Sequence, residues 1–213
     1  DELTDRAALL TASRRQVAAI LEEAAMNELS DLAMPKCRFT IGWSAQNSDG
    51  WRGCRQGAET CEFLISANPG EPLRPLVKVA SGGELSRIML ALKTVLARTQ
   101  GTPTLIFDEI DVGVSGHAAQ RIAEKLAGLA NSGTQVLVVT HSAQMAAMAN
   151  EHYQIEKRVV DNRTVTYVEL LVSEMRVPEV ARLLAGGAQS ELALQHANEL
   201  LRLAQDYRAS LVV

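Results

Sequence analysis

Two short apolar runs constrain the fold of this chain more than any other feature. The first is TLIF at residues 104–107, and the second is QVLVV at residues 135–139. Residues 117–130, between them, place Ile122, Leu126 and Leu129 at helical spacing. Runs without polar alternation predict strands that are buried on both faces, the usual state of a parallel sheet. The order strand, helix, strand therefore predicts a βαβ unit of an α/β protein.

Each of these runs ends in side chains that can carry chemistry. Asp108 and Glu109 follow the first run, Asp111 lies in the next loop, and His141 follows the second run. Ligands of parallel sheets bind at the carboxyl ends of the strands, so we expect these groups to converge at one edge. Two other interpretations stay open: an acidic pair at a strand end is often only solvated, and a single histidine is often structural.

The stretch SGGELSR at residues 81–87 precedes apolar side chains at three- and four-residue steps, which predict a helix from Glu84 to about Arg98. Glycines let the backbone approach a ligand, and the first turn of a helix has unpaired N–H groups. Such an end binds anions, above all phosphate. The alternative is a loop followed by an ordinary capped helix.

The N-terminal residues Glu2 to about Ala33 contain no glycine or proline, which predicts a long helix. Leu3, Leu10, Val17 and Ala24 recur at seven-residue intervals, a spacing typical of a coiled-coil seam. An amphipathic helix that lies on its own domain explains the same pattern. If the helix belongs to a coiled coil, its partner strand is absent from this chain.

Alternation predicts two antiparallel strands after this helix, at residues 36–43 and 61–66. Trp51, Arg52 and Arg55 in the polar connection could stack on and neutralise a nucleic-acid strand, or could simply be solvated. A proline-rich stretch, residues 68–75, leads irregularly to the glycine pair.

The C-terminal part of the chain completes the predicted α/β arrangement. We expect a short helix at residues 142–149, then a hairpin of residues 153–159 and 164–171 around Asp161 and Asn162. Two helices, at residues 177–184 and 191–207, are expected to follow.

Composition narrows the possible functions only a little. A net charge of −4 gives no global attraction to nucleic acid, so DNA contact would need a local basic patch. No apolar run reaches the roughly 18 residues that span a membrane, so we expect a cytoplasmic protein without a membrane partner. Cys37, Cys54 and Cys61 lack zinc-site spacing and predict free, mostly buried thiols. Because residue 1 is an aspartate inside an expected helix, we expect a native N-terminus upstream.

In order and spelling, the motifs resemble the ABC ATPase heads of the SMC-like group. The resemblance rests on VASGGELSRIMLALK at 79–93, TLIFDEIDVGVSG at 104–116 and VLVVTH at 136–141. The segments at 63–76 and 181–187 extend the match to most of residues 60–205. It implies an ABC-type P-loop NTPase head whose C-terminal lobe, residues 35–213, has a parallel sheet flanked by helices. Residues 1–34 would end a coiled-coil arm.

The resemblance also implies cofactors, partners and residue roles. ATP and Mg²⁺ would be the cofactors, and the partners would be the N-terminal half of the head, a second head and DNA, in bacterial double-strand-break repair and recombination. Asp108 would hold Mg²⁺, Glu109 would be the catalytic carboxylate and His141 would sense the γ-phosphate. The residues expected to contact ATP of the opposing head or to lie at the head interface are Ser81, Gly82, Gly83, Glu84 and Asp111.

The sequence departs from the family pattern in one respect. It contains no G-x-x-x-x-G-K-[ST], the loop that cradles nucleotide phosphates. We therefore expect a C-terminal half-head that is inactive alone and becomes an ATPase with its N-terminal half. The alternative is a non-catalytic module for dimerisation and DNA docking. A transporter subunit is disfavoured, because it would carry the phosphate loop upstream on the same compact domain.

Overall fold

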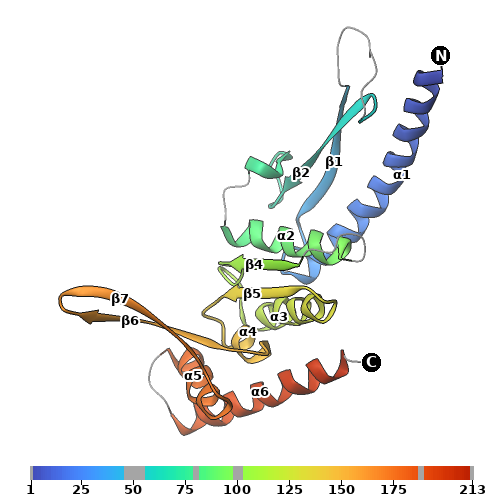
Figure 1. Ribbon diagram of the computed structural model, residues 1–213. Helices are drawn as coiled ribbons and strands as arrows, with labels where there is room; N and C mark the ends of the chain where they lie inside the picture. The colour runs from blue at the N-terminus through green and yellow to red at the C-terminus, as the bar shows by residue number, and fades with distance from the viewer. Residues whose placement is uncertain (1, 46–55, 79–81, 98–102, 187–189, 212–213) are drawn as a thin grey trace. The chain divides into compact units, whose positions relative to one another are not determined.

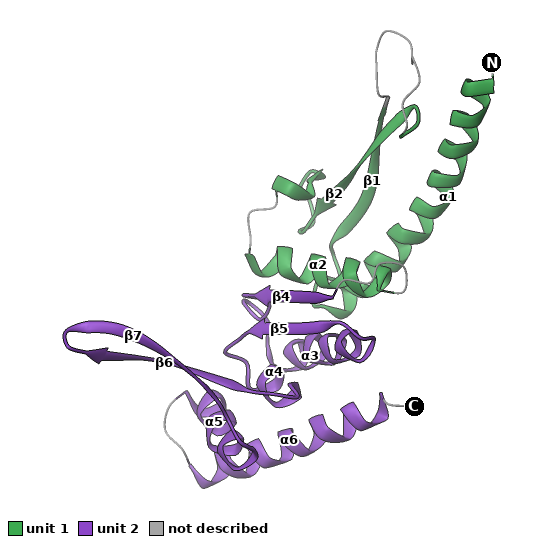
Figure 2. Cartoon of the chain, in the orientation of Figure 1, with its two compact units in different colours: residues 1–100 green, residues 101–213 purple. Residues whose placement is uncertain are grey.

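The computed structural model describes residues 2–45, 56–78, 82–97, 103–186 and 190–211. The chain divides into two compact units, residues 1–100 and 101–213, coloured separately in Figure 2. The predicted loop residues Trp51, Arg52 and Arg55 lie outside the described residues, as do Cys54 and Ser81. The boundary between arm and head at residue 34 remains a prediction.

The first unit begins with the long helix α1, Glu2–Asp31, which runs beside a pair of strands (Figure 1). Its inward face consists mostly of small side chains, namely Ala7, Ala18, Ala25 and Leu29. The predicted seam lies on another face, where Leu3 is 53% exposed and Val17 is 60% exposed. The helix therefore packs on its own domain and still leaves an apolar stripe at heptad spacing uncovered by the described residues.

The strands of the first unit form an antiparallel sheet in the order β1, β2, β3. Strand β1 is Arg38–Ala45, β2 is Glu59–Ser66 and β3 is Arg74–Pro75, followed by the short 3₁₀ helix η1, Leu76–Lys78. Cys37, Phe39 and Ile41 turn one face inward as the alternation predicted. Glu22 of α1 accepts hydrogen bonds from Thr40 Oγ1 at 2.8 Å and the Ile41 amide at 2.6 Å, which holds the helix against the sheet. Helix α2, Gly82–Leu96, completes the unit.

The second unit contains the predicted βαβ unit. Strand β4, Thr104–Asp108, and strand β5, Gln135–Val139, pair in parallel, with α3, Gly116–Asn131, as the crossover. This arrangement confirms the α/β class. The prediction that both strands are buried on both faces is wrong within the described residues, because Ile106 is 70% and Val139 is 50% exposed. Only one face is covered, by the buried apolar side of α3, which packs against β5.

The rest of the second unit is helical apart from one hairpin. Helix α4, Ala143–Met148, is followed by β6, Tyr153–Val160, and β7, Arg163–Leu170, which extend away from the helices in Figure 1. Asp161 and Asn162 have φ of 49° and 61°, as the tight turn of a hairpin requires. Helices α5, Ser173–Ala185, and α6, Glu191–Ser210, then pack with α4. Their shared core is Ala143, Ala146, Val180, Ala181 and Ala197.

Three sequence predictions need correction or comment. Helix α5 begins at Ser173, one turn before the predicted start, because Pro178 is accommodated inside the helix and does not mark its first turn. Of the two described cysteines, both free, Cys37 is buried but Cys61 is exposed, so burial was predicted wrongly for Cys61. Among the described residues, no helix combines the length and the apolarity that crossing a membrane requires.

Candidate functional site

The glycine pair lies where the sequence placed it, at the start of α2. Gly82 and Gly83 are its first two residues, and Gly83 is buried. Arg87, one turn further on, is only 7% exposed, and burial lowers the pKa of its guanidinium while the charge of Glu84 opposes that shift. Burial, and after it Glu84, also raise the pKa of the Cys37 thiol to about 11. The start of α2 therefore places two glycines one turn before a buried arginine that interacts with Glu84.

The acidic pair follows strand β4 at its carboxyl end. Asp108 is the last residue of the strand, Glu109 begins the next turn, and both are exposed. Glu109 has φ of 58°, a left-handed backbone that is unusual for a residue other than glycine. The next residue, Ile110, is fully buried and anchors the turn. Strained backbone of this kind is concentrated at functional sites, so the conformation of Glu109 points to a role for its side chain.

Asp111 accepts several hydrogen bonds from the segment that follows strand β5. Its carboxylate is buried, and Oδ2 accepts hydrogen bonds from Thr140 Oγ1 at 2.5 Å, the His141 amide at 3.0 Å and the Ser142 amide at 3.1 Å. The same oxygen lies 3.3 Å from Nδ1 of His141, whose imidazole is 78% exposed. The buried carboxylate of Asp111, in the turn after strand β4, thus holds the segment that joins β5 to α4.

The structure brings together part of the predicted site. Asp108, Glu109 and Asp111 share one turn, and Asp111 contacts His141, as expected for neighbouring parallel strands. Gly82, Gly83 and Glu84 belong to the first unit and are described separately from this cluster.

The exposed carboxylate of Asp108 could supply one ligand to a metal ion. Mg²⁺ is usually held by one or two carboxylates together with phosphate oxygens and water, so the exposed Asp108 fits such an ion. No group of three or more His, Cys, Asp or Glu in the described part of the chain could enclose a metal by itself. An ion at Asp108 would need further ligands, such as water or phosphate oxygens.

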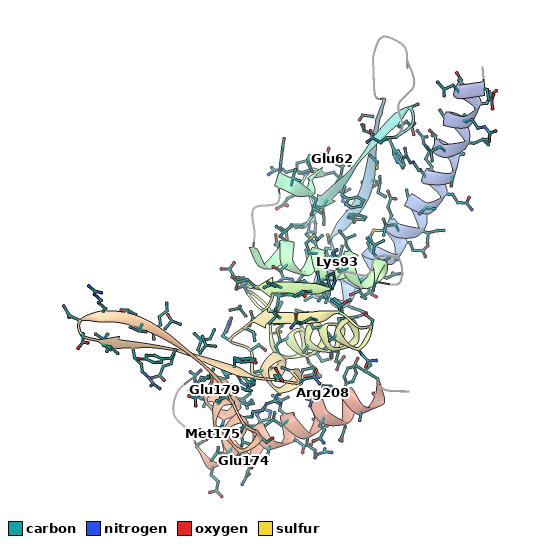
Figure 3. The ribbon with its side chains drawn as sticks, viewed as in Figure 1. Glu62, Lys93, Glu174, Met175, Glu179 and Arg208 are labelled. Atoms are coloured by element: carbon teal, nitrogen blue, oxygen red, sulfur yellow. The ribbon has the colours of Figure 1, made fainter. Side chains whose placement is uncertain are left out.

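The sequence analysis missed the side chains that fix the far end of α4. Arg176 of α5 donates to Ala146 O at 3.0 Å and Ala149 O at 2.8 Å, while Arg208 of α6, labelled in Figure 3, donates to Met148 O at 2.8 Å. Each arginine lies at least 26 residues away in the chain from the carbonyls it contacts, so no local pattern could have revealed the pairing.

Comparisons with known proteins agree with the motifs. The DNA repair protein RecN of Halalkalibacterium halodurans is 45% identical over 210 residues, 98% of this chain. The chain is a homologue of RecN. RecN of Deinococcus radiodurans is 47% identical over 192 residues, and RecN of Treponema pallidum is 53% identical over 146 residues, 90% and 68% of this chain. No family model matches the sequence.

The match covers only part of each RecN protein. The chain spans 37% of the length of the H. halodurans protein and 33% of the D. radiodurans protein. Solved structures similar to the chain include one from work on ATP-driven dimerization and DNA stimulated activation of SMC ATPases. Its TM-score is 0.48, with 18% identity, over 84% of this chain and 99% of that chain. The Smc head domain of Pyrococcus furiosus, bound to the C-terminal domain of ScpA, has a TM-score of 0.49 and 21% identity over 80% of this chain and 39% of that chain. The similarity to RecN rests on the sequence relatives.

Proposed function

We propose that this chain is the C-terminal half of an SMC-like ATPase head, which hydrolyses ATP once the N-terminal half is present. ATP-dependent dimerisation of two such heads would act on DNA in double-strand-break repair and recombination. The observation that carries the proposal is the exposed Asp108 and Glu109 pair at the end of β4, beside His141 after the parallel neighbour β5. Homology to a DNA repair protein supports it.

In this proposal, Glu109, Asp108 and His141 have different roles in ATP hydrolysis. Glu109 orients the attacking water and accepts its proton, since an exposed carboxylate at a fixed turn can act as a general base. Asp108 holds Mg²⁺, which when bound neutralises charge on the phosphates. His141 senses the γ-phosphate through its exposed imidazole.

The start of α2 contacts the nucleotide of the opposing head. Its glycines allow close backbone approach, and the positive end of the helix dipole favours an anion. Ser81 and Glu84 belong to the same contact, and the loop that carries Asp111 lies at the head interface. The partners are thus the N-terminal half, a second head and DNA, in the bacterial cytoplasm at the nucleoid.

The test is phosphate release by the chain alone and after addition of the N-terminal half of the same protein. We expect no steady turnover by the chain alone, because its sequence lacks the phosphate-cradling loop. The completed head should turn over, and Glu109→Gln should reduce kcat by at least about 100-fold while ATP-bound dimers persist in size-exclusion chromatography. Glu156→Gln, an exposed carboxylate of the hairpin, is the matched control.

Two results would overturn the proposal. Turnover by the 213-residue chain alone, abolished by Glu109→Gln, would exclude a half-head. Normal turnover of the completed Glu109→Gln head would show that another group activates the water.

A non-catalytic module for dimerisation and DNA docking is the second candidate. The missing phosphate loop favours it, whereas the exposed Asp108, Glu109 and His141 favour catalysis. Dimerisation without any turnover in the completed protein would support the module.

A further inference from the structure

Asp111 follows the end of β4 and His141 follows the end of β5, and the two side chains meet at one oxygen atom of Asp111. Oδ2 of Asp111 lies 3.3 Å from Nδ1 of His141 and accepts hydrogen bonds from the backbone amides of His141 and Ser142. The Asp111 side chain is 3% exposed and the His141 side chain is 78% exposed. The buried carboxylate therefore faces one ring nitrogen from inside, while the rest of the ring faces outward.

We propose that Asp111 is a positioning residue that fixes the tautomer and the ring orientation of His141. The expected effect on ATP hydrolysis rests on the proposed function, whereas the contact between Asp111 and His141 does not. A carboxylate 3.3 Å from Nδ1 favours a proton on that nitrogen, so Nε2 of the neutral ring is left as a hydrogen-bond acceptor. The amides of His141 and Ser142 donate to the same oxygen, which fixes the backbone position from which the imidazole extends.

The role differs from a contact across a head interface. A side chain that is 3% exposed and bonded to Thr140, His141 and Ser142 is occupied within its own chain. Loss of Asp111 should therefore change His141 in a single copy of the chain, without a second head or a nucleotide.

Nitrogen NMR of the imidazole rings in the unmodified chain is the first test. His141 is assigned by comparison with His141→Gln, and the exposed His117 and His196 serve as references for histidines in water. We expect His141 to carry its neutral-form proton on Nδ1, whereas free histidine favours Nε2. Finding the Nε2–H form in the unmodified chain would overturn the proposal without the need for any variant at Asp111.

Asp111→Ala should return His141 to the tautomer mixture of the two reference histidines. Thr140→Val is the matched control, because it removes another hydrogen bond to the same carboxylate oxygen and leaves the contact with Nδ1 in place. It should keep the Nδ1–H form. If Thr140→Val changes the tautomer as much as Asp111→Ala does, Asp111 acts only through the packing of the loop and the proposal is wrong.

Kinetics of the completed head supply an independent readout. Loss of a group that orients a functional side chain typically costs about 10- to 100-fold in activity, so Asp111→Ala should lower kcat by that factor with a smaller change in KM for ATP. A normal kcat would overturn the positioning role. If the completed head shows the expected tautomer but no turnover, the proposal of ATP hydrolysis is wrong. The proposal that Asp111 positions His141 would still hold.

Discussion

Nη1 of Arg208 donates a hydrogen bond to the carbonyl oxygen of Met148 at 2.8 Å, across 60 residues of sequence. Arg176 binds the neighbouring carbonyls of Ala146 and Ala149. Burial lowers the pKa of both guanidinium groups, and the charge of Arg208 lowers that of Arg176 further. Asp111 holds the segment before the same helix. Helix α4 is thus fixed at both ends, which connects the two C-terminal helices to the position of His141.

Removing Arg208 should destabilise the second unit. Arg208→Ala leaves the Met148 carbonyl at the end of α4 without its arginine donor, whereas Arg176 still donates to Ala147 and Ala149. An unsatisfied buried acceptor costs about 1–3 kcal/mol. The control is Arg202→Ala on the same helix, because Arg202 is 58% exposed and only forms ion pairs with Glu199 and Asp206. It should change the free energy of unfolding by less than about 0.5 kcal/mol. Urea denaturation measures both, and equal losses would refute the role of Arg208.

The left-handed backbone of Glu109 predicts a conflict between stability and function. Glycine adopts this conformation without strain, whereas other residues pay about 1–2 kcal/mol, partly offset by the greater freedom of glycine in the unfolded chain. Glu109→Gly should therefore raise the free energy of unfolding by about 0.5–1 kcal/mol, although it removes the proposed catalytic carboxylate. Glu109→Gln retains the strain and should leave stability unchanged. Thermal unfolding distinguishes the two variants. If Glu109→Gly is less stable than the unmodified chain, the backbone of Glu109 is not strained.

Local patterns in the sequence predicted most elements of this fold. The apolar runs located β4 and β5, and Asp161 with Asn162 located the hairpin turn, because each signal lies within a few neighbouring residues. The candidate residues at the ends of β4 and β5 followed from the same patterns, since parallel strands bring their carboxyl ends to one edge.

Features that depend on distant contacts could not be predicted. Ile106 is apolar whether or not anything covers it, so its sequence context did not show that one face of the β4 and β5 pair is exposed. The burial of Asp111 depends on hydrogen bonds to residues about 30 positions away. The φ angle of Glu109 is likewise set by the packing of the turn, because glutamate has no preference for it.

The two faces of α1 should respond differently to truncation. Leu29 is 1% exposed, and Leu29→Ala should cost about 2–5 kcal/mol because it leaves a cavity. Val17 is 60% exposed, so Val17→Ala should cost less than about 0.5 kcal/mol in the 213-residue chain. If the stripe is a coiled-coil seam, Val17→Ala should become clearly destabilising once the partner helix of the arm is supplied. Equal effects with and without that helix would favour an amphipathic helix with no partner.

The two described cysteines should differ sharply in reactivity. Burial and the charge of Glu84 raise the pKa of the Cys37 thiol to about 11, so the thiolate that reacts with iodoacetamide is scarce at pH 8 and increases only as the pH rises toward that value. Cys61 is exposed, and its labelling should be at least about tenfold faster at pH 8. Peptide mass spectrometry measures the two rates separately. Unfolding in urea is the control and should remove the difference, whereas equal rates in the folded chain would show that Cys37 is not buried as described.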